Sequence, residues 1–488
     1  MRWGISFIIF VLLPFSAQAG GGYIITESGA PSKWDNSSAI RIHPESGACG
    51  SFTNAQMLTK LEDNLGYWLD LTEVDLDFTV TSGSISGVDG CNYGNYLVGV
   101  DGASNAGISD GLNPVLFDND GEIVAAVAGT QNKFRVLGFS NPSGFANDYA
   151  KIVDGQAVFN CRCLAGNTNG ACTSSSSTIT FSEDELNFTM VHELGHMLNL
   201  DHTQVNANLV DGSTDDDTYI PTMYPVSENA AAQISPMQDD TVALGTIYPS
   251  SNFTSTYCHV TGTLLDEDSN PLRCADVQAK TSDDADSVAF VSGAYAPAVD
   301  NNDDGDTADS GECSSNCGDF QLYLTPGKSY TISVKAINSS FTGGSGISPC
   351  ANSQLSTIVD QDIATVTGSQ CTAGGTLSLG NLTTQSTGGV TSSINALLED
   401  ESLNLTQTGE VPKVIGGNNN TLQTSTSCPE SVASTTTSSS SSGGSCQLAP
   451  SLTINLTSFW LLTGLFGIFL LFRLNQGRKS GSHGQNSL

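Results

Sequence analysis

The segment Val191–His202 constrains the fold of this chain more than any other. It contains His192, Glu193 and His196, and helical spacing places residues i and i+4 on one face, so both histidines can bind a single ion. His202 can add a third imidazole only if the helix stops sharply after His196. Because a catalytic zinc ion prefers three protein ligands and one open position, the segment predicts a helix that ends at a tight turn beside a zinc site.

Two downstream features accompany this motif. Pro221–Pro225 places Met223 in a tight turn, and the run Gln238–Tyr248 is similar to the last helix of the matrixin branch of the metzincins. Together with the pattern H-E-x-x-H-x-x-G-x-x-H, these features give residues 23–250 a resemblance to bacterial matrixin-like zinc metalloproteases. Asn199 stands where that family has glycine, and asparagine tolerates the left-handed conformation better than most residues.

The resemblance implies hydrolysis of peptide bonds in protein or peptide substrates. The zinc ligands that it implies are His192, His196 and His202. Glu193 is then the general base that takes a proton from a zinc-activated water and passes it to the leaving amine. Met223 is expected under the metal, and Tyr224 either lines the substrate cleft or packs internally.

Two alternatives remain open from the sequence. In gluzincins the third ligand is a glutamate on a downstream helix, and Glu228 is the nearest candidate, although it follows a proline-bounded turn. The alternative function is a surface adhesion or binding protein with a catalytically vestigial metzincin domain. Degenerate domains tend to lose the general base, so the presence of Glu193 favours an enzyme.

Hydrophobic periodicity predicts an α+β fold for the first half of the chain. Apolar positions at helical spacing indicate a helix over 53–70, and alternating positions indicate strands at 39–43 and 75–80. A further strand is expected at Ile123–Val127, and the metal-binding helix is expected over 184–199. We therefore expect a metzincin-type catalytic domain, in which a twisted sheet carries helices and the zinc lies on the active-site helix.

From about residue 256 the sequence changes to short strand-like runs without a convincing helix. The segments VTGTLLDEDSNPLRCADVQAK and GDFQLYLTPGKSYTISVKA resemble the carboxypeptidase-regulatory-like fold, in which a Pro-Gly turn precedes the last strand. The resemblance implies a small all-β sandwich that serves as a packing or spacer unit.

Both ends of the chain carry apolar runs. Residues 1–19 are predicted to be a secretory signal, because Arg2 precedes a short apolar stretch and Ala17–Ala19 forms a small-x-small cleavage site. Leu456–Phe472 is about long enough to span a bilayer, and basic residues follow it. With Cys446 before it, this tail resembles the C-terminal sorting signals of bacterial surface proteins, which a membrane-bound protease removes. We expect an exported protein at the cell surface or outside it, either anchored by this segment or released.

The sequence thus predicts five regions. They are a signal peptide at 1–19, a metzincin metalloprotease domain at 20–255, a β-sandwich at 256–372, a Ser/Thr/Gly-rich linker at 373–452 and a transmembrane or sorting segment at 453–488. The linker assignment depends on composition, because such a tract buries too little apolar area to offset chain entropy.

The chain is strongly acidic, with 50 Asp and Glu residues against 16 Lys and Arg residues and a net charge of −34. Nucleic acid is excluded as a partner because no basic stripe is present to neutralise phosphates. The acidity favours solubility, and Asp118–Gly121 and Asp300–Gly311 also resemble calcium loops, although Gly311 stands where an EF-hand has glutamate. The 13 cysteines of an exported chain predict disulfides whose connectivity the spacing leaves open.

Overall fold

The structure, a computed structural model, describes residues 21–83, 85–97, 111–128, 130, 132–134, 136–146, 149–167, 180–210, 217–297, 316–337 and 358–385. All described residues belong to one compact unit. The predicted signal peptide, the Asp300–Gly311 loop and the sorting segment with Cys446 lie outside the described residues. Among the helices in the described ranges, none is long and apolar enough to cross a membrane.

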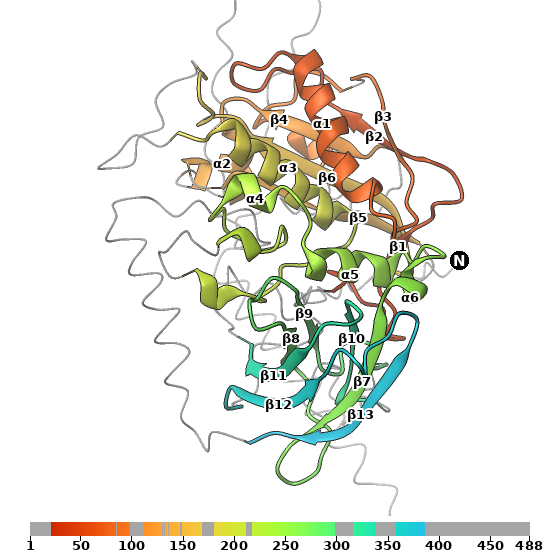
Figure 1. Ribbon diagram of the computed structural model, residues 1–488. Helices are drawn as coiled ribbons and strands as arrows, with labels where there is room; N and C mark the ends of the chain where they lie inside the picture. Colours follow the sequence, from red (N-terminus) through yellow and green to blue (C-terminus); the bar gives the residue numbers. More distant parts are fainter. Residues whose placement is uncertain are drawn as a thin grey trace, which may run out of the picture. The chain divides into compact units, whose positions relative to one another are not determined.

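A six-stranded sheet organises the first half of the described chain (Figure 1). Its strands are β1 (Lys33–Trp34), β2 (Ile40–Pro44), β3 (Phe78–Val80), β4 (Pro114–Asp118), β5 (Gly138–Ala146) and β6 (Lys151–Asn160). The order β1-β6-β4-β2-β3 is parallel throughout, and β5 pairs antiparallel with β6. Helices α1 (Asn54–Leu69) and α3 (Glu183–Met197) pack against each other, and α3 packs on β5 and β6. The chain therefore has an α+β fold, as its periodicity predicts.

Helix α1 begins at a capping box in which Thr53 and Gln56 bind each other's backbone N–H groups. Its apolar positions repeat at helical spacing and form one buried face, made by Met57, Leu61, Leu65 and Trp68. The indole N–H of Trp68 donates to the carbonyl oxygen of Val191 at 2.8 Å. The amphipathic face of α1 thus fixes the position of the helix that carries the predicted metal ligands.

Helix α3 also begins at a capping box, formed by Ser182 and Glu185. Three acidic residues in its first turn interact favourably with the positive end of the helix dipole, namely Glu183, Asp184 and Glu185. Every residue from Phe188 to Met197 is buried, so the helix runs through the core of this half.

The strand predicted at Ile123–Val127 was wrong, because these residues lie in helix α2 (Glu122–Ala128). Two acidic side chains cap this helix: that of Asp118, the last residue of β4, and that of Asp120, which lies between β4 and α2. Asp118 Oδ2 accepts from the N–H of Val124 at 2.8 Å, and Asp120 Oδ1 accepts from the N–H of Glu122 at 3.2 Å. A short apolar run fits either a strand or a buried helix. Here the hydrogen bonds from Asp118 and Asp120 to the first backbone N–H groups stabilise the helix.

Three shorter helices follow α3 in the chain: α4 (Ala230–Gln233), α5 (Gln238–Ile247) and α6 (Phe253–Thr256). Helix α5 coincides with the last helix expected from the sequence. Its Gly245 faces the ring of Phe253, where an added Cβ would lie 2.5 Å from two ring atoms. The absence of a side chain at Gly245 lets α6 pack closely against α5.

The second half of the described chain contains two sheets (Figure 1). The three-stranded sheet has the order β10-β7-β13 and the four-stranded sheet the order β12-β11-β8-β9. The strands are β7 (Cys258–Leu265), β8 (Ala275–Lys280), β9 (Ser287–Val291), β10 (Asp319–Leu324), β11 (Tyr330–Ala336), β12 (Gln361–Val366) and β13 (Thr376–Thr383). Both sheets contribute inward side chains to one core, among them Val260, Leu322, Val277 and Ile332. This is the arrangement of a β-sandwich.

The boundary predicted between 255 and 256 falls inside the last turn of α6, just before β7, and the packing crosses it. Val242 of α5 and Phe253 of α6 belong to the same core cluster as the strands of the sandwich. At the edge of the four-stranded sheet, the N–H of Ala289 in β9 donates to Asp239 Oδ1 of α5 at 2.7 Å. The sandwich is therefore packed onto the first half within one compact unit.

The linker predicted to start at residue 373 was wrong at its beginning, because β13 forms a strand there. Residues Thr376–Thr383 pair in parallel with β7, and Leu377, Leu379 and Leu382 pack against the sandwich core. The surrounding Ser, Thr and Gly residues lower the average hydrophobicity, but the leucines still reach one core. Composition averaged over a long tract conceals such a short apolar pattern.

Disulfide bonds connect distant parts of each half. Cys49 pairs with Cys161, and Cys258 pairs with Cys371. Four further described cysteines are also disulfide-bonded, namely Cys91, Cys163, Cys274 and Cys317. Disulfides of this kind persist in oxidising compartments.

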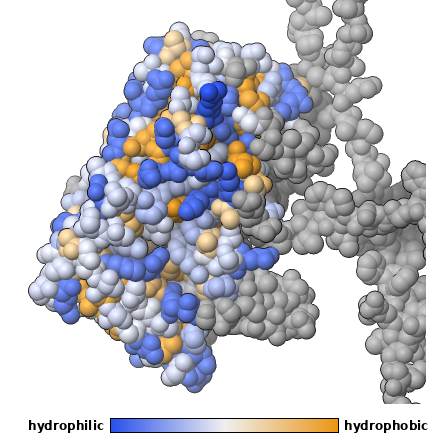
Figure 2. Space-filling view, turned by 90° about the vertical axis from the view of Figure 1, so that its right-hand side faces the viewer, coloured by the Kyte–Doolittle hydropathy of each residue, from blue (hydrophilic) through white to orange (hydrophobic). Residues whose placement is uncertain are grey.

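The surface of the described part is mixed in character. Figure 2 shows one face on which hydrophilic residues alternate with small hydrophobic patches. Three large hydrophobic side chains in the described ranges are exposed, namely Tyr67, Tyr149 and Val359.

Candidate metal centre

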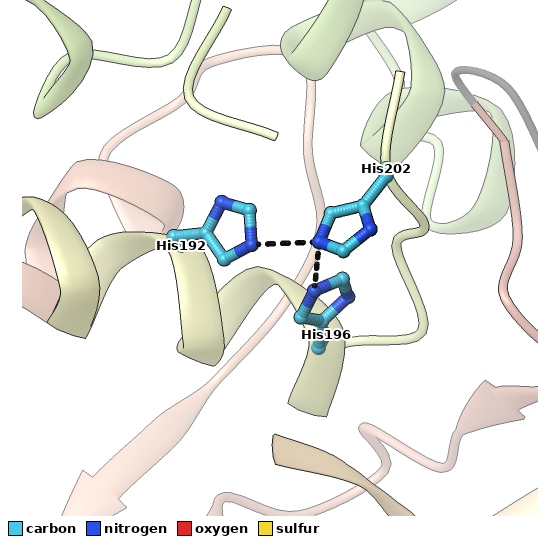
Figure 3. A group of neighbouring side chains, drawn as sticks. All are labelled: His192, His196 and His202. Atoms are coloured by element: carbon cyan, nitrogen blue, oxygen red, sulfur yellow. Dashed lines mark hydrogen bonds between the residues drawn. The ribbon is translucent and has the colours of Figure 1, made fainter. Parts of the chain in front are cut away.

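Three histidines that lie close in the sequence also meet in space (Figure 3). His192 and His196 project from successive turns of α3, and His202 approaches them from the segment after the helix. Nε2 of His202 lies 3.1 Å from Nε2 of His192 and 3.1 Å from Nε2 of His196. One ring nitrogen from each residue lies within 4.8 Å of the others, so the three residues can hold a metal ion.

The ring nitrogens facing away from this point have backbone partners. Nδ1 of His192 lies 2.7 Å from the carbonyl oxygen of Thr222, and Nδ1 of His196 lies 2.8 Å from that of Leu200. A carbonyl oxygen only accepts hydrogen bonds, so in both rings the proton is on Nδ1 and Nε2 presents a lone pair. The Nε2 atoms of His192, His196 and His202 therefore lie close together, and a cation bound among them would satisfy all three.

The spacing and the protonation states fit zinc. With Zn–N bonds of about 2.0–2.1 Å and tetrahedral angles, the ligand nitrogens lie about 3.3–3.4 Å apart, close to the 3.1 Å found here. Burial lowers the pKa of His196 to about 4. Burial, followed by the neighbouring histidines, also holds the pKa of His192 and His202 well below the usual range. The imidazoles are therefore neutral at pH 7, as metal binding requires.

The helix ends where the sequence requires it to end. Helix α3 stops at Met197, and Asn199 has a positive φ of 75°. The N–H of Leu200 bonds to the carbonyl oxygen of Gly195 at 2.9 Å, which closes the turn. The chain then reverses, and His202 returns to the face of His192 and His196.

The methionine turn is held by a carboxylate that the sequence motifs did not assign. Asp240 of α5 accepts from the N–H of Thr222 at 2.9 Å and from the N–H of Met223 at 2.9 Å. Because the Thr222 carbonyl is the partner of His192 Nδ1, Asp240 helps to orient this candidate ligand indirectly. Its position within the run Gln238–Asp240 was visible in the sequence, but nothing there indicated its partner.

Met223 lies directly against α3, the helix that carries His192 and His196. A Cβ added to Gly195 would lie 2.5 Å from Met223 Sδ and 3.0 Å from a ring carbon of Trp68. The side chain of Met223 is 2 % exposed. Glycine at position 195 therefore allows the methionine turn and α1 to pack closely under the two histidines.

We expect Gly195→Ala to destabilise the fold by roughly 1–3 kcal/mol, because the added methyl group overpacks this contact. The measurement is the free energy of unfolding in urea. Gly66→Ala in α1 is the matched control, since its Cβ would meet only Asp70 Oδ2 at 3.8 Å. That variant should be stabilised by about 0.4–1 kcal/mol. Equal stability changes in the two variants would contradict the close packing at Gly195.

Glu193 lies on α3 directly after the first ligand and is fully buried. Its side chain packs beside β5: a Cβ added to Gly138 would lie 3.0 Å from Glu193 Cγ. A carboxylate one residue after a candidate ligand, on the same helix, is the pattern typical of a general base beside a bound metal ion.

The remaining sequence candidates lie elsewhere. Tyr224 is 4 % exposed and packs with Leu209 and Ile220 in a small core cluster. Glu228 does not belong to the group of described residues that could hold a metal, and burial followed by the charge of Asp217 raises its pKa to about 7. In the Asp118–Gly121 calcium-loop candidate, Asp118 and Asp120 cap helix α2.

Asp239 is a second carboxylate of α5 that the motifs did not assign. Burial raises its pKa to about 8, and the negative charge of Asp240 contributes to this rise. It accepts hydrogen bonds from the side chain of Thr203, next to His202, and from the backbone of Ala289 in the sandwich. Asp239 thus links the segment of the third ligand to the second half of the chain.

We expect Asp239→Asn to be more stable than the wild type at alkaline pH. The folded pKa of Asp239, about 8, is above the usual value of 3.8, so the folded state binds more protons between these values. The stability of the wild type should then fall as pH rises through this window, whereas the Asn variant lacks this titration. Melting temperatures from pH 5 to pH 9 check this, and a difference that stays constant across the range would contradict it.

Asp266→Asn is the control for this measurement. Hydrogen bonds from the side chain and the backbone N–H of Asn270 lower the pKa of Asp266. This variant should therefore gain no stability relative to the wild type at alkaline pH.

Comparison with models of known protein families and with curated proteins found no match to this chain. Its function is therefore inferred from the residues and geometry of the site alone.

Proposed function

We propose that this protein is a zinc-dependent endopeptidase of the metzincin type, exported and displayed at or released from the cell surface. One observation carries the proposal: the Nε2 atoms of three neutral histidines converge, with Glu193 next to the first of them on the same helix. The turn around Met223 beneath this helix agrees with the metzincin motif in the sequence.

Zinc bound by His192, His196 and His202 would polarise the scissile carbonyl group and activate water for attack. Glu193 removes a proton from the attacking water and delivers it to the nitrogen of the leaving amine. The backbone carbonyls of Thr222 and Leu200 hold the imidazole rings in orientation throughout. No covalent acyl-enzyme is needed.

The export part of the proposal is supported by the disulfides and by the predicted signal peptide. Cys49–Cys161 closes the first half and Cys258–Cys371 closes the sandwich, and bonds of this kind form in oxidising compartments. The predicted processing point at Cys446 belongs to the same proposal.

The experiment uses the purified full-length chain. We expect one zinc ion per chain by elemental analysis, and cleavage of casein or gelatin that a chelator abolishes and added zinc restores. Zinc without cleavage of any protein substrate would overturn the peptidase and favour the binding protein with a vestigial domain. A chain without zinc affinity would overturn the metal centre.

A further inference from the structure

The carbonyl groups of residues 197–200, at the end of α3 and in the turn that follows it, each accept a hydrogen bond. Their hydrogen-bond partners are, in chain order, the indole N–H of Trp34, the hydroxyl of Tyr248, the backbone N–H of Tyr23 and Nδ1 of His196, at 2.8, 3.0, 2.7 and 2.8 Å. Two of these four partners come from the beginning of the described chain.

We define residues 21–34 as the N-terminal strap. It runs alongside the turn that separates His196 from His202. Gly22 forms an antiparallel bridge with Leu200, and the N–H of Asp201 donates to the carbonyl oxygen of Gly21 at 3.1 Å. The strap and the turn fit closely, because a Cβ added to Gly22 would lie 3.2 Å from Asn199 Nδ2.

The side chain of Asn199 binds the strap at three points. Its Oδ1 accepts from the N–H of Ile24 at 2.8 Å, and its Nδ2 donates to the carbonyl oxygens of Ile24 at 3.1 Å and Ser32 at 2.7 Å. The residue is fully buried and has a φ of 75°. Glycine adopts this backbone conformation more readily than asparagine but makes none of these bonds. The conformation of the turn therefore does not explain why asparagine is present.

The turn that follows α3 orients two of the candidate ligands, His196 and His202. The carbonyl oxygen of Leu200 is the partner of His196 Nδ1, and Asp201 Oδ1 accepts from the N–H of His202 at 2.7 Å. Both residues are held by the strap through Gly21 and Gly22. Any movement of the strap thus moves the groups that set the ring of His196 and the backbone of His202.

We propose that Asn199 is a positioning residue, which ties the N-terminal strap to the end of the metal-binding helix and so fixes the geometry of His196 and His202. The proposal depends on the metal centre of the proposed function. Groups that orient metal ligands typically contribute about 10- to 100-fold to metal affinity.

The test compares Asn199→Gly with the wild type as full-length chains. The glycine keeps the conformation of the turn and removes only the three hydrogen bonds to the strap. We expect the dissociation constant for zinc, measured by competition with a chelator, to rise about 10- to 100-fold. In the cobalt-substituted protein, the visible absorption bands should shift, because they report the arrangement of the ligands.

Trp34→Phe is a second variant on the strap side of the same contact. It keeps most of the ring packing and loses the indole N–H bond to Met197. It should change zinc affinity and the cobalt spectrum in the same direction as Asn199→Gly. If either variant lowers folding stability but leaves the cobalt spectrum as in the wild type, the contact stabilises the fold without positioning the ligands.

Ser269→Gly is the matched control, because Ser269 is exposed on a sandwich loop and also has a positive φ, of 67°. It should leave zinc affinity unchanged. If Asn199→Gly binds zinc as tightly as the wild type with an unchanged cobalt spectrum, the positioning role is overturned while the metal centre stands. If the wild type itself binds neither zinc nor cobalt, the metal centre and the positioning role both fail.

Discussion

Replacing Glu193 by glutamine is expected to lower kcat for peptide cleavage by roughly 10²- to 10⁴-fold, the usual contribution of a general base. Glutamine has the same shape as glutamate but cannot accept a proton from the attacking water at neutral pH. Glu193 is fully buried beside β5, so an isosteric replacement should leave the packing against Gly138 intact. The measurement is steady-state cleavage of a peptide substrate at saturating zinc.

The zinc content of the Glu193→Gln variant is the control for this result. Because the proposed ligands are the three histidines and not Glu193, the variant should bind zinc as the wild type does. Equal activity of variant and wild type would exclude Glu193 as the base. Lost activity together with lost zinc would mean that Glu193 supports the site and not the chemistry.

The histidine cluster could be predicted from the sequence because its geometry is local. His192 and His196 are separated by one helical turn, and His202 follows after a turn whose residue, Asn199, can adopt a positive φ. The caps of α1 and α3 could be read in the same way, since each capping box spans only four residues.

The contacts that hold the cluster in place are not local. Asn199 and Ile24 are separated by 175 positions, and Asp240 binds Met223 across 17. A single sequence gives no means of pairing such residues before the fold is known. For the same reason the asparagine could be interpreted only as a substitute for glycine, whereas its side chain makes three specific bonds.

The two wrong predictions of secondary structure have separate physical causes. In α2 the apolar run is too short for its period to be read, and the side chains of Asp118 and Asp120 decide for a helix. In β13 the polar composition of the tract hides leucines that pack on the sandwich core.

Replacing His202 by alanine is expected to weaken zinc binding by far more than about 100-fold, because even groups that only orient a ligand contribute 10- to 100-fold. The residue lies 3.1 Å from both other ligand nitrogens, and its loss leaves two imidazoles on one helix face. Activity should be lost in parallel. Chelator competition measures the affinity, and peptide cleavage measures the activity.

Two control variants test whether His202 is the third ligand. His259→Ala removes a histidine that stacks on Tyr323 in the sandwich, at 4.5 Å between ring centroids, and should leave zinc affinity unchanged. Glu228→Ala tests the glutamate alternative, and we expect it to retain zinc because Glu228 lies outside the histidine group. Zinc retained by His202→Ala but lost by Glu228→Ala would assign the third ligand to the glutamate and make the centre a gluzincin site. The reverse result would leave the three histidines as the complete protein ligand set, with the fourth position open to water and substrate.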